Sequence, residues 1–407
     1  MYSENALVTI LMCSHIDAKK GGFQPFTALE WSKLVIKIIG TDLKEPSTLL
    51  RLSKEEIEEQ LQIDSGEAER ILKLLSRGAN MAFILEDLER KGIKVVTRSD
   101  GNYPSRLKSL LKKQAPPLFY YAGNLDLLNY KSIAIVGSRN IDKEDENFAY
   151  SLAKKASDER IVVVSGGAKG VDSISEEAAL QNNGVAVSVI ADSLTRKIKK
   201  KSIRDAVIEG RLLVMSAINP DAPFSAGSAM SRNKYVYALS MSAFIIASDF
   251  NKGGTWSGAV ENLKNDWVKS FVLESDKHNG NIELIRKGVR PISDLNDFTL
   301  VDLINSEKDI YKQVNVFEVS SEIQEENGAY SQKIAGKVEE SDSTSPFDLY
   351  YSFIDKLEGL LSNPRSLEDI MGYYKTNKSQ TVIWLNRALD EELITKMVKP
   401  VRYMFNK

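Results

Sequence analysis

From residue 131 onward, short apolar segments alternate with amphipathic helical segments. The apolar runs, which we expect to form buried strands, cover 133–136, 161–164, 185–190, 212–215, 243–247 and 270–273. Helical patterns lie between them, near 144–156, 172–181, 203–209, 232–240 and 257–265. This alternation predicts an α/β fold whose Rossmann-like parallel sheet has helices on its faces.

The part of the chain before this sheet differs in its pattern. Residues 1–90 carry apolar side chains at helical spacing, and Ser53 followed by Glu56 forms a capping-box pattern. We therefore expect a helical module of the SAM or helix-hairpin-helix type at 1–90. Two extended segments come next, at 92–96 and 115–121. We assign them to an extended Rossmann-like core that covers 91–305.

The end of the chain predicts a linker and one more domain. Residues 306–345 are polar, so we expect them to link two domains. Helical patterns follow near 347–361, 366–373 and 378–390, and two strand patterns follow at 393–396 and 400–403. Three helices and a hairpin are the outline of a winged helix, which we expect at 346–407.

Composition narrows the classes of function. The formal net charge is −2, so nucleic-acid binding would have to come from a local basic patch. Cys13 is the single cysteine and the chain has two histidines, so we expect no disulfide, no metal and no cofactor. No stretch approaches the ~20 apolar residues of a membrane span. We expect a soluble, cytoplasmic protein.

Polar and glycine-rich segments follow the predicted strands. They are Gly137-Ser138-Arg139, Ser165-Gly166-Gly167-Ala168-Lys169-Gly170, the basic run 196–204 with Lys199, Lys200 and Lys201, Ser231-Arg232-Asn233-Lys234, and Gly253-Gly254-Thr255. We expect Ser231–Lys234 to open a helix and Gly253-Gly254-Thr255 to precede one. Glycines let a ligand approach the backbone, and helix N-termini and cations attract anions. Because ligands bind at the carboxyl ends of parallel strands, these segments predict one phosphate-binding site.

The spacing of these glycines does not match a dinucleotide fingerprint. Gly166-Gly167-Ala168-Lys169-Gly170 follows the second strand and lacks the Gly-x-G-x-x-G spacing, and it is not a Walker loop. A polymer such as single-stranded DNA would also need aromatic side chains on which bases stack. Tyr235, Tyr237 and Trp256 are candidates, although aromatic residues at helical positions usually belong to the core.

The order of these motifs resembles the DprA/Smf DNA-processing family, of which this chain looks like a divergent member. The resemblance is carried by Ile133–Arg139, Ser165–Asp172, Ser231–Lys234, Gly253–Thr255, Asn279-Gly280 and the lead-in Asn102-Tyr103-Pro104 with Pro116–Asn124. It implies a non-enzymatic protein that binds single-stranded DNA, dimerises and hands the DNA to a RecA-type recombinase. The residues implied to line the phosphate pocket are Gly137, Ser138, Arg139, Gly166, Gly167, Lys169, Arg232, Asn233 and Lys234.

Three departures separate this chain from the usual family pattern. Ser175-Glu176 stands where the family has Ala-His, Ala229–Lys234 replaces Phe-Pro-x-Arg-Asn-Arg, and Glu274-Ser275-Asp276 replaces a Pro-Gly. Divergent members are expected to act outside DNA uptake, for example in a phage-defence or toxin–antitoxin locus, where a cognate toxin would be the partner.

Two other functions fit the same loops. One is a nucleotide N-glycosidic-bond hydrolase of the lysine-decarboxylase-like (LOG) group, which uses Gly-Gly-x-Gly-Thr and a glutamate three residues later. Here Glu261 lies one position beyond the place of that glutamate, which turns its side chain by ~100° on a helix. The other is a regulatory or antitoxin protein that senses a nucleotide in the same pocket.

Overall fold

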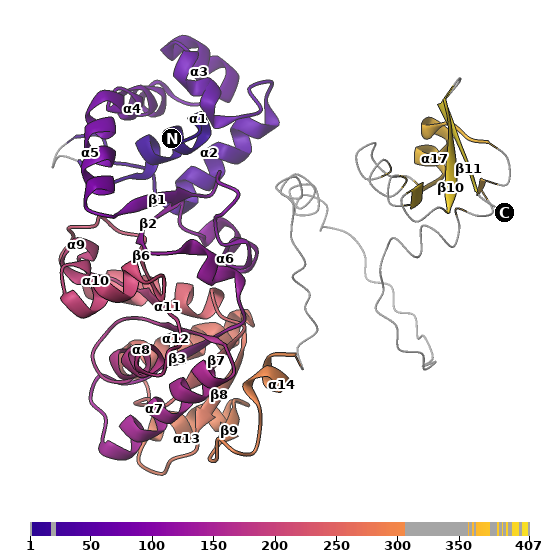
Figure 1. Cartoon of the computed structure of the whole chain (residues 1–407). Helices are drawn as coiled ribbons and strands as arrows, with labels where there is room; N and C mark the ends of the chain where they lie inside the picture. Colours follow the sequence, from indigo (N-terminus) through magenta and orange to yellow (C-terminus); the bar gives the residue numbers. More distant parts are fainter. Residues whose placement is uncertain are drawn as a thin grey trace. The chain divides into compact units, whose positions relative to one another are not determined.

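The computed structural model describes residues 2–17 and 22–305 and, nearer the C-terminus, 357, 360–361, 364–374, 381, 385, 388–389, 393–398 and 401–405. The chain divides into two compact units, unit 1 (Met1–Gln324) and unit 2 (Glu325–Lys407). Figure 1 shows the helices and strands of both units.

Unit 1 is built on a nine-stranded sheet of order β1-β2-β6-β5-β4-β3-β7-β8-β9. The strands are β1 (Lys94–Thr97), β2 (Leu118–Ala122), β3 (Ser132–Val136), β4 (Val162–Ser165), β5 (Ala186–Val189), β6 (Leu212–Ser216), β7 (Ser242–Ile245), β8 (Lys269–Leu273) and β9 (Arg290–Ile292). The seven strands from β6 to β9 are parallel, and β1 and β2 extend the sheet in antiparallel fashion. The predicted Rossmann-like sheet is confirmed, and β9 is an additional strand.

The strand order reverses at the centre of the sheet. From β3 the chain adds β4, β5 and β6 on one side, then returns to β7 on the other side of β3. The loops after β3 and β7 therefore leave neighbouring strands in opposite directions, which opens a crevice at the carboxyl ends of these strands. The topology places the candidate site at this edge.

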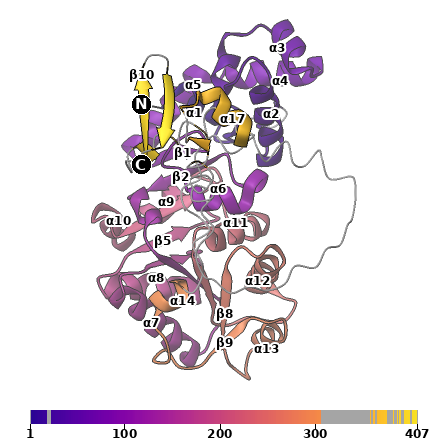
Figure 2. The same cartoon turned by 90° about the vertical axis from the view of Figure 1, so that its right-hand side faces the viewer.

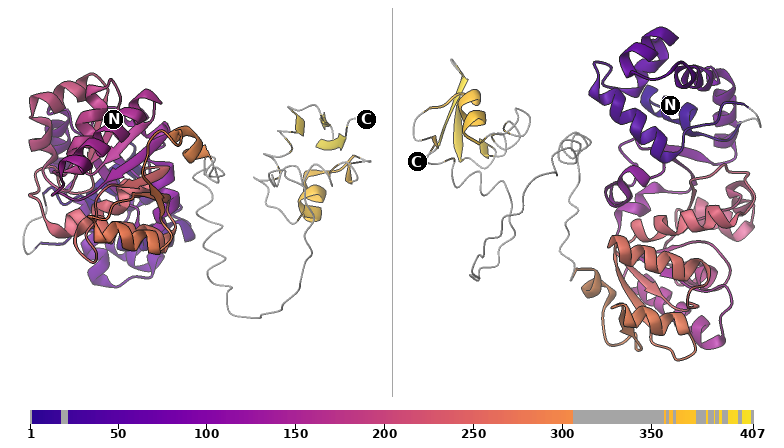
Figure 3. Two further views of the ribbon diagram at one scale, coloured as in Figure 1. Left: turned by 90° about the horizontal axis from the view of Figure 1, so that it is seen from below. Right: turned by 180° about the vertical axis from the view of Figure 1, so that it is seen from behind.

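Helices cover both faces of the sheet because both faces of its strands are apolar. On β3, Ile133 and Ile135 belong to one core cluster, whereas Ala134 and Val136 belong to the other. The first cluster includes side chains of α7 (Lys143–Asp158), α8 (Val171–Gln181), α9 (Leu194–Ile198), α10 (Lys201–Ile208) and α14 (Leu300–Asn305). The second includes α6 (Ser105–Leu111), α11 (Ala226–Ala238), α12 (Gly253–Asn265) and α13 (Asn279–Arg286). Figure 3 gives two further views of this arrangement.

The N-terminal helices pack on the antiparallel end of the same sheet. They are α1 (Glu4–Cys13), α2 (Ala28–Gly40), η1 (Pro46–Arg51), α3 (Lys54–Leu61), α4 (Ser65–Leu75) and α5 (Gly78–Arg90). The predicted capping box of α3 is confirmed, because the Ser53 and Glu56 side chains each accept a backbone N–H of the other residue. A buried 2.7 Å hydrogen bond joins the Ser14 and Tyr120 hydroxyls, and the hydrophobic core continues from these helices onto the sheet.

Two helix starts differ from the predictions. Helix α11 begins at Ala226, because the Ser225 side chain caps it by accepting the backbone N–H of Ser228. The segment Ser231–Lys234 therefore lies inside a helix and does not open one. Similarly, Gly253-Gly254-Thr255 forms the first turn of α12 rather than a loop before it. The basic run 196–204 is also helical over most of its length, in α9 and α10.

Unit 2 contains a helix and a hairpin among its described residues. The helix is α17 (Leu367–Tyr374), and the antiparallel strands are β10 (Ile394–Val398) and β11 (Val401–Phe405). The predicted hairpin and middle helix are thus confirmed. The predicted linker 306–345 and most of the helical patterns at 347–361 and 378–390 lie outside the described residues. The three boundaries between the four proposed domains stay a prediction.

Within the described ranges, no helix is both long enough and apolar enough to cross a membrane.

Candidate functional site

The loops after β3, β4 and β7 contact one another at the carboxyl edge of the sheet. The backbone N–H of Ser138 donates to the carbonyl of Ala247 at 2.9 Å, and the N–H of Val171 donates to the carbonyl of Ser138 at 3.4 Å. Gly170 has φ +81°, and a Cβ atom at that position would lie 2.4 Å from the Ser138 carbonyl oxygen. This close approach requires glycine, so the structure brings the predicted loops together.

Arg232 reaches from the middle of α11 to the turn after β4. Its Nη1 atom lies 3.6 Å from Oδ2 of Asp172 in α8, and only 8% of Arg232 is exposed. A Cβ atom at Gly166 would lie 1.1 Å from the same Nη1, so the guanidinium occupies the space that a side chain at 166 would need. Burial raises the pKa of Asp172 and lowers that of Arg232, and each charge opposes the shift of the other.

A second ion pair lies beneath the same turn. Nζ of Lys197, from α9, is 3.2 Å from Oε1 of Glu176 in α8, and both side chains are largely buried. The Ser165 hydroxyl donates to the other Glu176 oxygen at 3.4 Å. A Cβ atom at Gly167, whose φ is +63°, would be 3.4 Å from the Lys197 ammonium and 2.6 Å from the Ser188 hydroxyl. Sequence reasoning noticed Glu176 only as a departure and did not predict this pair.

The exposed cations of the predicted site fall into two groups. Arg139 and Lys169 are exposed in the loops after β3 and β4. The other group, Lys199, Lys200 and Lys201, is exposed at the junction of α9 and α10. These side chains, unlike Arg232 and Lys197, present their charge at the surface where a phosphate could bind.

The remaining predicted residues lie on α11 and in the first turn of α12. The Asn233 side chain donates to the Gly254 carbonyl at 2.9 Å and ties α11 to the first turn of α12, which also contains Gly253 and Thr255. The Nζ atom of Lys234 donates to Oε1 of Gln114 at 3.4 Å. Burial lowers the pKa of Lys234.

Helices α8 and α12 both begin at this edge without a side-chain cap. The N-cap residues are Gly170 and Lys252, and neither side chain accepts a backbone N–H of the first turn. The first N–H groups of a helix have no partner within the helix, and the helix dipole favours an anion beside them. Two helix N-termini therefore add to the attraction of Arg139 and Lys169 for phosphate.

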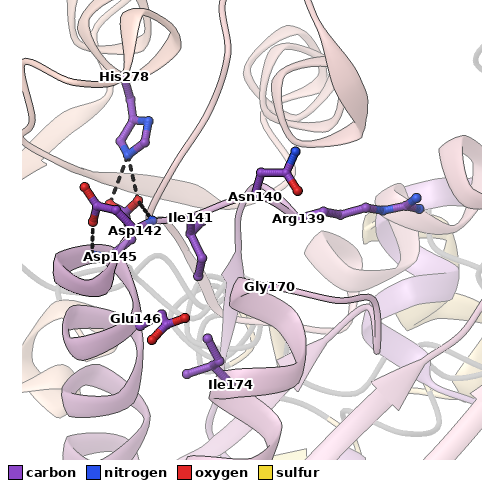
Figure 4. Close-up of a pocket in the computed structure, with 9 residues that line it drawn as sticks. All are labelled: Arg139, Asn140, Ile141, Asp142, Asp145, Glu146, Gly170, Ile174 and His278. Carbon is purple, nitrogen blue, oxygen red and sulfur yellow. Dashed lines mark hydrogen bonds and ion pairs between the residues drawn. The ribbon is translucent and has the colours of Figure 1, made fainter.

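A cavity of about 600 Å³ is lined in part by Arg139 and Gly170. Its lining consists of Arg139, Asn140, Ile141, Asp142, Asp145, Glu146, Gly170, Ile174 and His278, which Figure 4 shows as sticks. Nε2 of His278 lies 2.9 Å from both carboxylate oxygens of Asp145. Lys277 hydrogen-bonds Asp142 and lowers its pKa to about 2. Carboxylates dominate this cavity, and the Arg139 side chain extends away from them, so a phosphate is not expected inside it.

The aromatic candidates Tyr235, Tyr237 and Trp256 are buried and belong to the core. In contrast, Phe224 is 51% exposed in the loop before α11, and the Arg139 guanidinium lies 5.0 Å above its ring. Phe250, in the loop after β7, is 44% exposed. Sequence reasoning missed both phenylalanines. Their position in loops that follow β6 and β7 was the available signal, because loops at this edge contribute to the site.

Among the described residues, no three side chains of His, Cys, Asp or Glu are placed to hold a metal ion.

Comparison with known proteins agrees with this fold. A Streptococcus pneumoniae protein, "DNA processing protein DprA", is 28% identical over 198 residues, which are 48% of this chain and 69% of that protein. "Protein Smf" of Escherichia coli is 25% identical over 168 residues, or 41% of this chain and 44% of that protein, so the match spans less than half of Smf. The X-ray structure of the S. pneumoniae DprA aligns with a TM-score of 0.56 at 21% identity, covering 73% of this chain and 97% of that one.

The sequence profile of the family described as "DNA recombination-mediator protein A" matches residues 94–301. This range includes every strand of the nine-stranded sheet and all the glycine loops described above. It extends over half of the 407 residues. The chain therefore belongs to the DNA recombination-mediator protein A family.

Proposed function

We propose that this protein binds single-stranded DNA, with the phosphates of the strand at the carboxyl edge of the sheet. The observation that supports the proposal is that Arg139 and Lys169 are exposed in the loops after β3 and β4, at the edge of the sheet where α8 and α12 begin without a side-chain cap. Charged donors and helix N-termini together form an anion site. The chain's membership of a DNA recombination-mediator family supports DNA as the source of that anion.

Exposed aromatic rings beside this site favour a single strand over a duplex. The Phe224 ring lies next to Arg139, and Phe250 lies on the neighbouring loop, so unpaired bases could stack beside phosphate-binding groups. Bases inside a duplex are stacked already and offer no free face. The exposed Lys199, Lys200 and Lys201 widen the charged surface beyond the size of one nucleotide.

We also propose that the protein delivers the bound DNA to a recombinase. The family resemblance supports protection of single-stranded DNA, its transfer to a RecA-type recombinase, and action as a homodimer in the cytoplasm. The Glu274–Asp276 departure lies outside the phosphate-binding loops, so it bears on steps after DNA binding. Glu176 instead contacts Ser165 and Lys197 beneath the turn after β4, so that departure bears on binding itself. A cognate toxin or effector is the alternative partner if the protein acts in a defence locus.

A binding role is favoured over hydrolysis of nucleotides. Glu261, which would have to act as the acid, interacts electrostatically with Lys234 and Tyr235 on α11. A carboxylate that acts on α11 side chains, one position beyond the place of the LOG glutamate, supports a binding role.

A titration with labelled oligonucleotides at several salt concentrations tests the proposal. We expect tighter binding to a single strand than to a duplex of the same length, and affinity that falls with salt. Arg139→Gln should weaken binding, whereas Arg90→Gln, which removes an exposed charge from α5, should not. Equal affinity for single strand and duplex would overturn the proposal. Release of free base from a nucleoside monophosphate would favour the hydrolase instead.

A further inference from the structure

The segment between β1 and β2 is strongly basic although the whole chain is slightly acidic. Residues 98–117 contain five cations, namely Arg98, Arg106, Lys108, Lys112 and Lys113, and a single carboxylate, Asp100. The Asp100 side chain accepts the backbone N–H and the hydroxyl of Thr97, at 2.7 and 2.9 Å. This local excess of positive charge lies outside the glycine loops.

The fold places this segment between the N-terminal helices and α11. Nη1 of Arg98 donates to the Ser32 hydroxyl of α2 at 2.9 Å, and that hydroxyl donates to the Lys113 carbonyl at 3.3 Å. Lys113 belongs to η2 (Lys112–Gln114), whose Gln114 accepts from Lys234 of α11. Helices α2, α6, α11 and α12 lie on the side of unit 1 that faces the viewer in Figure 2. We call Arg98, Lys108, Lys112 and Lys234 the α6 strip.

Three cations of the α6 strip, Arg98, Lys108 and Lys234, are partly buried, whereas Lys112 is exposed. Burial lowers the pKa of both Arg98 and Lys108, and repulsion from Arg98 lowers the pKa of Lys108 further. The groups that act on Arg98 are Tyr103 and Cys13, which burial keeps uncharged at neutral pH.

The pKa of an ion-paired cation shifts in the opposite direction. Hydrogen bonds to Asp142 and Glu144 raise the pKa of Lys277. Burial of Arg98, Lys108 and Lys234 thus carries a cost that an incoming anion would offset.

The strip also continues from the candidate phosphate site. Asn233 of α11 contacts Gly254 in the first turn of α12, and the next residue, Lys234, donates to Gln114 of η2. One carboxylate, Glu261, acts on Lys234 and only partly offsets the effect of burial. A strand whose phosphates occupy the glycine loops would therefore find further cations along α11 and η2.

We propose that the α6 strip is a second anion-binding surface, which holds the phosphate backbone of the DNA strand where it continues beyond the glycine loops toward the N-terminal helices. This inference rests on the proposed function. An acidic protein segment is the less favoured partner, because residues 98–117 contribute no large exposed apolar side chain, and protein interfaces usually have an apolar centre. The strip is instead charged along its length, as surfaces that follow a nucleic-acid backbone are.

The test compares oligonucleotides of about 6 and about 20 nucleotides, because a single site commonly spans ~4–16 nucleotides. The long strand should bind more tightly than its extra length alone explains, with a steeper dependence on salt. In the double variant Lys108→Gln/Lys112→Gln this advantage should fall about fivefold per lost phosphate contact at 0.1 M salt, because each contact contributes a slope of ~0.7. Binding of the short strand should not change.

The matched control is Lys44→Gln/Lys73→Gln, which removes two exposed lysines, one between α2 and η1 and one on α4. An advantage of the long strand that persists in the Lys108/Lys112 variant would overturn the inference. Poly-glutamate that binds as tightly as the long strand, and is released by the same variant, would also overturn it in favour of an acidic protein partner.

Different results would overturn the glycine-loop site and the α6 strip. If the short strand does not bind wild type, or if Arg139→Gln leaves its binding unchanged, then the glycine-loop site is wrong. Long-strand binding that survives Arg139→Gln but is lost in the Lys108/Lys112 variant still supports the strip.

Discussion

Two acids, one turn apart on α8, neutralise two of the cations that surround the glycine turn. Asp172 pairs with Arg232, and Glu176 pairs with Lys197. Both pairs are largely buried, so these cations hold α9 and α11 against α8 and offer little charge to a ligand. The exposed Arg139 and Lys169 remain for phosphate.

Replacing Gly166 should show how closely Arg232 is packed. In Gly166→Ala the new methyl group would overlap Nη1 of Arg232 and lie 2.5 Å from Oδ2 of Asp172. We expect a loss of about 1–3 kcal/mol in the free energy of unfolding, typical of an overpacked core. Denaturant unfolding measures it.

Gly227→Ala is the control for that experiment. Gly227 lies in the first turn of α11, and a Cβ atom there would meet nothing within 4 Å. Alanine is the better helix former, so this variant should be at least as stable as wild type. Equal stability of the Gly166 variant and the control would show that Arg232 is not held at the turn.

Removing the charge of Glu176 should change both stability and binding. Glu176→Gln leaves the Lys197 ammonium largely buried without its counter-charge, which should lower the free energy of unfolding by about 1–3 kcal/mol. Lys197 is then available to a phosphate, so the affinity for a 6-nucleotide strand should rise about fivefold at 0.1 M salt. Denaturant unfolding and fluorescence titration measure the two effects.

The neighbouring residue provides the control for this variant. Glu177 is exposed on the same helix, so Glu177→Gln removes the same charge without touching Lys197. An equal rise in affinity in both variants would mean that only the long-range field changed. The idea that Glu176 restrains Lys197 would then be wrong.

The ion pairs of α8 could not be predicted from the sequence. Asp172 and Glu176 lie in the first two turns of α8, while their partners lie on helices that follow β5 and β6. Sequence patterns reveal that such loops meet at one edge, but the exact pairing depends on side-chain reach across neighbouring crossovers. For this reason Arg232 and Lys197 looked like available cations until the structure showed their partners.

At the scale of elements, the loop between β6 and α11 is the part of the site that sequence reasoning passed over. It presents Phe224 beside Arg139. In Phe224→Ala, affinity for a single strand should fall about 5- to 150-fold, because stacking contributes ~1–3 kcal/mol per base. Phe83→Ala, on α5 and 71% exposed, is the matched control and should bind normally. Unchanged affinity after loss of Phe224 would exclude stacking at this ring.

Long apolar or amphipathic elements were predicted well, and short or irregular ones were not. The central strand β3 is fully buried, so its apolar run is unambiguous. Strand β9 has three residues, of which one is Pro291, and gives almost no pattern. The start of α11 was placed late because its first residues, Ala226-Gly227-Ser228, look like a loop, whereas the Ser225 cap establishes the helix.

At the scale of the whole molecule, the parallel order of the sheet followed from the alternation of strands and helices. The antiparallel addition of β1 and β2 did not, because it depends on pairing of β2 with β6, which is distant in sequence. The packing of the N-terminal helices on the sheet could not be predicted either, because it joins residues that are distant in sequence, such as Ser14 and Tyr120.

Unit 1 should fold without unit 2. Among the described residues, two core clusters contain residues from Val8 to Ile304, and a third contains residues from Leu357 to Tyr403. Since each unit has its own hydrophobic core, a chain of residues 1–324 should unfold cooperatively with the denaturant midpoint of the corresponding transition in the full chain. Both the glycine loops and the α6 strip lie in unit 1, so this shorter chain should also keep the affinity of the full chain for 6- and 20-nucleotide strands. A lower midpoint would mean that unit 2 stabilises unit 1. A normal midpoint with weaker binding of the 20-nucleotide strand would mean that unit 2 contributes to the DNA-binding surface.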